Sequence, residues 1–293
     1  MAFVETVLAI VTSMLLYIFL PPLLDGIERK IRAKIQTRYG PPTILQTWYD
    51  IIKLSSKELR IPPTLHYSLF LFILSLSLSI TTLYLLSYIL ISFDIYTLTI
   101  IVVLIISTHS LLILVSTLSS NPFSIIGVFR GLTIDIVNEM GFIASIPLYY
   151  LSIKTFDSSV KSFILLLFSI LFIFIVSYVG SKRLPYDLHE AEPELASGSI
   201  IEFSGPMLAI YLYLHLIDRY TVIALPITMG IGIGLAVTPF VSLFFIHVIA
   251  ALVYIIFGAV AALLGRSRID IAVKTLMLIY LLIVIAWIVV KLI

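Results

Sequence analysis

Long apolar segments recur along almost the whole chain of 293 residues. Each is about 20 residues long, enough for an α-helix to cross a hydrocarbon layer about 30 Å thick. The composition agrees, because 61% of the residues are hydrophobic, 12% are charged and the mean hydropathy is +1.17, whereas soluble domains are about 25% charged. Continuous Leu, Ile and Phe runs do not match the alternation of a membrane β-barrel. Scarce Asn and Gln are typical of thermophilic proteins. The sequence therefore predicts an all-α integral membrane protein.

We expect one membrane domain over residues 1–293, a bundle of about eight transmembrane helices. The first segment has no basic region or cleavage site typical of a signal peptide, so we expect it to remain as a span. The sixth span is interrupted by Asp218 and Arg219. The expected spans are 3–24, 66–92, 97–117, 134–153, 161–180, 206–229, 239–264 and 269–291.

Basic residues between the spans orient the bundle, because Lys and Arg remain on the cytoplasmic side. The segment 25–65 is strongly basic, and placing it inside leaves few basic residues outside. This predicts a multi-pass protein of the cell (plasma) membrane with both termini outside. The loops 25–65 and 181–205 are then cytoplasmic. The other basic residues placed inside are Arg130, Lys182, Arg183, Arg266 and Arg268.

Within residues 25–65, an amphipathic helix is predicted after the turn Gly40–Pro42. Its apolar positions Leu45, Trp48, Ile52 and Leu59 recur at roughly helical spacing. Such a helix is expected to lie in the membrane interface with its apolar stripe in lipid or against the bundle. It could tether the loop or serve as a platform for a peripheral subunit.

The loop 181–205 is rich in carboxylates in an otherwise apolar chain. Crowding and partial burial raise carboxyl pKa values, so such a cluster can hold and pass protons near neutral pH. A solvated acidic loop is the alternative. Pro193 disfavours one continuous helix. The acids are Asp187, Glu190, Glu192, Glu194 and Glu202.

Ionisable residues within the expected spans are candidates for a proton path, because charge at membrane depth is costly. Asp135 and Glu139 are spaced to share one face of the fourth span. In the sixth span, His215 is expected to face either Asp218 or Arg219, since those two adjacent side chains diverge. Buried charge compensation is the alternative role for this cluster.

No cofactor is expected in this chain. It contains no cysteine, so it cannot hold a thiolate-ligated iron–sulfur cluster, and any redox centre must belong to a partner. His189, Glu190 and Glu194 lack the second histidine of a typical metal site. His109 and His247 are isolated on apolar spans, where a hydrogen bond to a neighbouring helix is the expected role.

Two motifs resemble a known family. LPYDLHEAEPELASGSIIEFSGP is similar to the signature loop of the H subunit of respiratory complex I (subunit 1 of NADH dehydrogenase) and of its counterparts in energy-converting membrane-bound (group 4) nickel–iron hydrogenases. A second motif is matched by Glu28, Arg29, Lys30, Arg38, Gly40, Pro41, Leu45, Gln46, Asp50, Lys53 and Leu54. With the span layout and RSRID before the last span, the resemblance covers essentially the full chain.

Departures from the family pattern favour one branch. In residues 40–46, GPP runs almost directly into TILQ. This turn is shorter than in the respiratory branch and is similar to the turn of the hydrogenase branch. His215 stands about where many quinone-reducing relatives carry a glutamate.

The resemblance implies a membrane anchor and coupling subunit of a redox-driven ion-translocating complex, not catalytic alone. Its partners would be a cytoplasmic arm with iron–sulfur clusters and a nickel–iron-type centre, linked to ferredoxin and hydrogen evolution, and antiporter-like membrane subunits; no nucleic acid is expected. Coupling of H⁺ or Na⁺ would involve the five loop acids with Asp135, Glu139, His215 and Asp218. The peripheral arm would dock on Arg29, Lys30, Arg38, Asp50 and Lys53.

Several alternatives remain open from the sequence. Within the family, they are a sulfur-reducing sister complex and a quinone-reducing complex I. Outside it, a free-standing secondary ion transporter would be expected to show internal repeats, and none is evident. A purely structural anchor is the last alternative.

Overall fold

The computed structural model describes residues 2–59, 66–89, 93–119, 121–156, 160–189, 198–231 and 239–292. Within these ranges the chain forms nine α-helices, one short 3-10 helix and no strand. Eight of the helices are long and apolar enough to cross a membrane, so the predicted all-α membrane fold is confirmed. The helices are α1 (Ala2–Ile35), α2 (Gln46–Ser55), α3 (Ser68–Tyr88), α4 (Ile95–Thr117), α5 (Pro122–Lys154), α6 (Val160–Gly180), η2 (Gly198–Ile200), α8 (Gly205–Ile231), α9 (Pro239–Leu263) and α10 (Ile269–Leu292).

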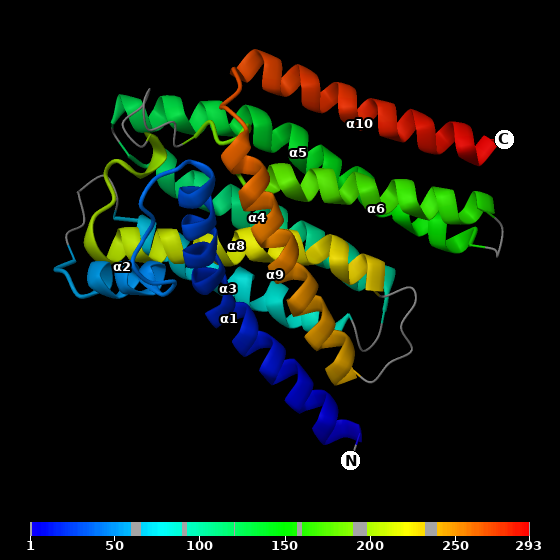
Figure 1. Ribbon diagram of the computed structural model, residues 1–293, viewed down its shortest axis with the longest axis horizontal. Helices are drawn as coiled ribbons and strands as arrows, with labels where there is room; N and C mark the ends of the chain where they lie inside the picture. The colour runs from blue at the N-terminus through cyan, green and yellow to red at the C-terminus, as the bar shows by residue number, and fades with distance from the viewer. Residues whose placement is uncertain are drawn as a thin grey trace.

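Helix α8 forms the centre of the bundle although it carries the charges that interrupt the sixth span. It packs against α1, α2, α3, α4, α6 and α9, and side chains such as Tyr220 and Ile223 are completely buried. Figure 1 shows α8 crossing the middle of the molecule, while α10 lies at the edge beside α5 and α6. Charged groups on α8 therefore face other helices, which explains how they are accommodated in this bundle.

Two helices are longer than the expected spans. α1 has 34 residues, roughly 50 Å at 1.5 Å per residue, and continues past residue 24 into the basic run. Pro21 and Pro22 lie inside it, and α1 changes direction along its length (Figure 1). α5 begins at Pro122, before the expected residue 134, where the Asn121 side chain accepts a hydrogen bond from Phe123 N at 2.9 Å. These extensions carry charged residues beyond the apolar runs that defined the spans.

The amphipathic helix α2 packs against α1 and α8. The Trp48 ring lies 5.9 Å from that of Phe19 and 6.1 Å from that of Tyr213, measured between centroids. Ile52 and Leu59, expected on the same apolar stripe, are exposed. Only part of the predicted stripe therefore faces the bundle, and α2 is fixed beside the charged end of α1.

Candidate functional site

A charged cavity of about 440 Å³ lies between α1, α2, α8 and the segment 181–189. It lies where the two segments singled out in the sequence, 25–65 and 181–205, come together. Five basic and three acidic side chains line it, together with Thr47, His215 and four aliphatic residues. The charged residues are Asp25, Arg29, Arg32, Asp50, Lys182, Arg183, Asp187 and Arg219.

The most deeply buried ion pair joins Glu28 on α1 to Arg183 after α6. The Arg183 guanidinium donates to both Glu28 carboxylate oxygens, and the two residues are 2% and 1% exposed. Arg32 Nη2 lies 2.8 Å from Glu28 Oε1, and the Arg183 guanidinium sits 4.3 Å from the centre of the Tyr254 ring. A Cβ at Gly258 on α9 would lie 2.3 Å from Glu28 Cδ, so only glycine permits this approach. One carboxylate thus fixes α1, the segment 181–189 and α9 together.

Arg219 links α8 to the same cavity. Its Nε donates to the Ser181 carbonyl at 3.0 Å, Nη2 lies 3.2 Å from His215 Nε2, and Nη1 lies 3.9 Å from Asp25 Oδ1. Of the two partners predicted for His215, the structure selects Arg219. The reason is geometric, because Arg219 is one full turn along the helix from His215 and Asp218 points elsewhere.

Asp218 faces α4, where it pairs with His109. His109 Nε2 lies 2.7 Å from Asp218 Oδ2, and Thr108 Oγ1 lies 3.2 Å from Asp218 Oδ1. Both ionisable side chains are almost fully buried. The sequence predicts a hydrogen bond from His109 to a neighbouring helix and does not place this residue among the proton-path candidates. The sequence does place His109 and Asp218 at a similar depth in their spans, which hints at a pair. It does not show that α4 lies beside α8, so the pair could not be predicted.

His247 is part of a hydrogen-bonded chain across four helices. The Tyr220 hydroxyl and Ser13 Oγ each lie 3.0 Å from a ring nitrogen of His247, and Ser13 Oγ is 2.9 Å from Ser87 Oγ. Because Ser87 donates to the Leu83 carbonyl, the chain is satisfied with a neutral imidazole. The hydrogen bonds expected for this histidine are therefore present, and they tie α1, α3, α8 and α9 together.

Two residues predicted to dock a partner bind each other. Arg29 Nη1 lies 2.8 Å from Asp50 Oδ2, and Gln46 donates to Asp50 Oδ1 at 3.0 Å. Partial burial pushes the Asp50 pKa upward, but the hydrogen bonds from Arg29 and Gln46 hold it below its usual value. This pair joins α1 to α2. Arg38 and Lys53 are exposed, and Lys30 is half-buried.

The predicted acidic cluster is described only in part. The Asp187 carbonyl accepts from Arg266 Nε at 2.8 Å, and the Asp187 carboxylate lies 3.4 Å from Arg266 Nη2. Glu202 has a buried carboxylate oxygen with no hydrogen-bond partner in the part of the chain that the structure describes. Glu190, Glu192 and Glu194 fall in the segment 190–197, outside the described residues.

On α5, Asp135 lies beside the segment 181–189, and Glu139 lies one turn further into the bundle. Asp135 Oδ2 lies 3.7 Å from Lys182 Nζ, and both side chains are buried. Glu139 is half-buried one turn further along. Lys182 lines the charged cavity as well, so it connects that cavity to α5.

His189 joins the segment 181–189 to α8. Its Cβ packs against Gly131, and its ring centroid lies 6.1 Å from that of His215. Burial, reinforced by the positive charge of Lys182, lowers the pKa of His189 to about 3. His189 is therefore neutral at physiological pH and does not contribute positive charge to the site.

We expect acidification to destabilise the folded protein through His189. Between pH 6.5 and about 3 the unfolded chain binds a proton there that the folded chain does not, so stability falls as the pH falls. Between pH 6.5 and 5 the free energy of unfolding is expected to fall by up to about 2 kcal/mol, at 1.36 kcal/mol for each pH unit. Thermal unfolding in detergent at pH 7 and 5 measures it, and His189→Gln is expected to show a smaller pH-dependent loss. Equal losses in both proteins would contradict this assignment.

Comparisons with known proteins agree on one family. A family model described as NADH dehydrogenase matches residues 6–292. NADH-ubiquinone oxidoreductase chain 1 of Mytilus edulis is 30% identical over 261 residues, covering 83% of each chain. An NADH-quinone oxidoreductase subunit of Solibacter usitatus and hydrogenase-4 component C of Escherichia coli are each 28% identical, and the alignments cover 74% and 66% of this chain.

The solved structures agree on the fold. A chain of the membrane-bound sulfane sulfur reductase, an archaeal respiratory membrane complex, matches with a TM-score of 0.77 at 22% identity, covering 99% of each chain. The aligned regions span 63% and 65% of the two bacterial relatives. Because the family model spans nearly every residue and the mussel relative aligns over most of both chains, this chain is a member of the NADH dehydrogenase family of membrane subunits.

Proposed function

We propose that this chain anchors a cytoplasmic redox arm to the membrane and couples its electron transfer to the translocation of protons or sodium ions. The charged cavity is the observation that carries this proposal. It brings the basic end of α1, the segment 181–189 and α8 into one ion-pair network. From there, α8 leads to the buried pair of Asp218 and His109.

The electron carriers belong to partner subunits in this proposal. The chain has no cysteine, whereas iron–sulfur clusters are held by thiolates in most proteins. The relatives are named as subunits or components of oxidoreductases, a hydrogenase and a sulfur reductase. We propose that a peripheral arm with iron–sulfur clusters and a nickel–iron-type centre docks near Lys30, Arg38 and Lys53, and that antiporter-like subunits bind in the membrane.

The cavity lining favours a complex that reduces protons or sulfur in its peripheral arm over a complex that reduces a quinone. A quinone has an apolar tail, and a ligand pocket for such a molecule is mainly apolar. Here eight of the lining side chains are charged and four are aliphatic. Ferredoxin-linked hydrogen evolution is our proposal, and quinone reduction by the purified complex would favour the alternative.

The distribution of basic residues supports a cytoplasmic opening of the cavity. Arg29, Arg32, Lys182 and Arg183 all line it, and Lys and Arg remain on the cytoplasmic side of the cell membrane. In this orientation both termini lie outside.

Purification from native membranes tests the proposal. A tagged copy of the chain is expected to co-purify with iron-containing subunits in fixed stoichiometry, measured by mass spectrometry and iron analysis.

Lys53→Glu with Arg38→Glu should reduce recovery of the peripheral arm, whereas Lys291→Glu at the other end of the bundle should not. Recovery of the chain alone with no iron, and ion uptake by vesicles that contain only this chain, would favour a free-standing transporter. If Glu190, Glu192 and Glu194 are neutralised and the assembled complex still couples normally, the chain is a structural anchor.

A further inference from the structure

Tyr220 and His247 form a hydrogen bond in the centre of the bundle, where α9 crosses α8 (Figure 1). The Tyr220 hydroxyl lies 3.0 Å from His247 Nδ1, and the two residues are 0% and 4% exposed. On the other side of the ring, His247 Nε2 lies 3.0 Å from Ser13 Oγ of α1, which lies 2.9 Å from Ser87 Oγ of α3. Both ring nitrogens of His247 therefore contact side chains of other helices.

The direction of this hydrogen-bonded chain assigns the tautomer of His247. Ser87 Oγ donates its single proton to the Leu83 carbonyl at 2.9 Å, so in its contact with Ser13 it can only accept. Ser13 donates to Ser87 and must then accept from His247, which places the imidazole proton on Nε2. Nδ1 therefore has a lone pair that accepts the hydrogen bond of the Tyr220 hydroxyl.

Aromatic rings enclose this bond. The Tyr17 ring of α1 lies 4.6 Å from the His247 ring and 5.4 Å from the Tyr220 ring, and the Tyr254 ring of α9 lies 6.4 Å from that of Tyr220. The two polar partners of His247 among the described residues are hydroxyl groups, so an imidazolium here would be a buried charge without a carboxylate beside it. The environment suits a neutral ring that orients Tyr220.

Tyr220 directly follows the two charged residues of α8 in the sequence. Asp218 Oδ2 lies 2.7 Å from His109 Nε2 on α4, and Arg219 Nε donates to the Ser181 carbonyl at 3.0 Å. Successive side chains on a helix point about 100° apart, so residues 218, 219 and 220 bind partners on different sides of α8. A rotation of α8 that breaks one of these contacts also displaces the other two.

We propose that His247 is a positioning residue for the coupling path. By accepting the hydrogen bond of Tyr220, it holds α8 in one rotation. In this rotation Asp218 faces His109, and Arg219 faces the charged cavity. The effect on ion translocation rests on the proposed function, whereas the orientation of α8 can be measured on the chain alone.

Nitrogen-15 NMR of the full-length chain in detergent, labelled only at histidine, tests the positions of these groups. The signals of His247 and His109 are assigned by their loss in His247→Asn and His109→Gln. In the wild type, His247 should carry its proton on Nε2. The His109 signal should report the contact with Asp218, because Asp218→Asn removes the charge beside the ring and displaces the signal.

Two substitutions of His247 each retain one side of its contacts. The side-chain oxygen in His247→Asn stands near the position of Nδ1 and can accept from Tyr220. The longer amide in His247→Gln reaches toward Ser13 and leaves Tyr220 without its acceptor. We expect His247→Gln and Tyr220→Phe to displace the His109 signal, and His247→Asn to retain it.

Ion translocation by the assembled complex in proteoliposomes is the second measurement. Tyr220→Phe and His247→Gln should each lower the number of ions translocated per electron about fivefold, the effect of one lost hydrogen bond. His247→Asn should restore most of this loss, because Tyr220 keeps an acceptor.

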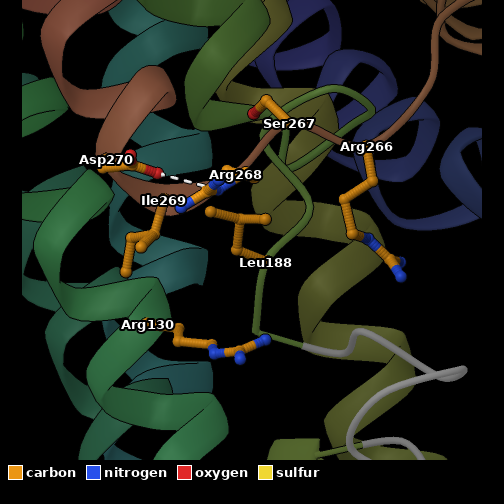
Figure 2. Close-up of a pocket in the computed structure, with 7 residues that line it drawn as sticks. All are labelled: Arg130, Leu188, Arg266, Ser267, Arg268, Ile269 and Asp270. Atoms are coloured by element: carbon orange, nitrogen blue, oxygen red, sulfur yellow. Dashed lines mark ion pairs between the residues drawn. The ribbon is translucent and has the colours of Figure 1, made fainter.

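Tyr280→Phe is the matched control, because it also removes a buried tyrosine hydroxyl. That hydroxyl lies 2.7 Å from the Asn138 side chain, and α10 packs against α5 and α6. The beginning of α10 also faces α5, where Arg268 lines a cavity of about 400 Å³ together with Arg130 (Figure 2). Tyr280→Phe should therefore leave the His109 signal in place.

Three results would overturn the positioning role. The first is an unchanged His109 signal in both Tyr220→Phe and His247→Gln. The second is an equal displacement in Tyr280→Phe, which indicates general loosening of the bundle. The third is a loss of translocation in both His247→Asn and His247→Gln with the His109 signal in place, which indicates that the ring itself transfers protons. A wild-type complex that translocates no ions contradicts the proposed function instead, and the His109 signals then decide the orientation of α8 alone.

Discussion

Glu28→Gln is expected to lower the free energy of unfolding by about 3–5 kcal/mol, because it leaves the buried Arg183 guanidinium without its compensating charge. The midpoint of thermal unfolding should fall by on the order of 10 °C. Samples are heated in detergent to a series of temperatures, and size-exclusion chromatography measures the fraction that remains monodisperse. The temperature at which this fraction falls to half is the midpoint. The substitution should also loosen the packing of α9 against α1, because Gly258 packs directly on the Glu28 side chain.

Two variants separate this effect from a general loss of acidic charge. Glu5→Gln changes an exposed carboxylate on the same helix and should alter the midpoint by no more than 1–2 °C, since an exposed charge contributes about 0–1 kcal/mol. Replacing both Glu28 and Arg183 with methionine removes the unpaired charge and should recover part of the stability. A Glu28→Gln protein as stable as wild type would show that the ion pair does not hold α1 in place.

Asp218→Asn is expected to slow ion translocation by about 100-fold or more, the lower range for the loss of a positioned proton-transfer group. The amide can still bond to His109 and Thr108, which lie 2.7 and 3.2 Å from the carboxylate oxygens, but it cannot exchange a proton at physiological pH. The assembled complex in proteoliposomes, with redox turnover and the ion gradient recorded together, provides the measurement.

The conservative variant makes this test specific to proton transfer. Asp218→Asn should retain its unfolding midpoint to within a few degrees, whereas Asp218→Leu should lose both stability and translocation because it removes the acceptors of His109 and Thr108. Asp270→Asn alters an exposed acid outside the bundle core and should translocate normally. Normal translocation by Asp218→Asn would assign the pair with His109 a structural role only.

Much of the architecture could be predicted from the sequence. Apolar segments long enough to cross a membrane specify helices, because unpaired backbone groups are costly in lipid. Helix ends were less predictable, since α1 and α5 extend beyond their apolar runs under local control by capping and charged residues. Spacing along α2 shows which residues share a face, but only the packing shows that Trp48 meets the bundle while Ile52 stays exposed.

The candidate site shows the same division. An all-helical membrane chain and a concentration of carboxylates in 181–205 follow from the sequence alone, since length, hydropathy and charge are properties of local segments. The pairing of the charged groups comes from the packing of the helices: Glu28 pairs with Arg183, Asp218 with His109, and Arg219 with both His215 and the Ser181 carbonyl. These partners are up to 155 residues apart. A buried charge requires a partner, but which helix supplies it depends on packing that a single sequence does not specify.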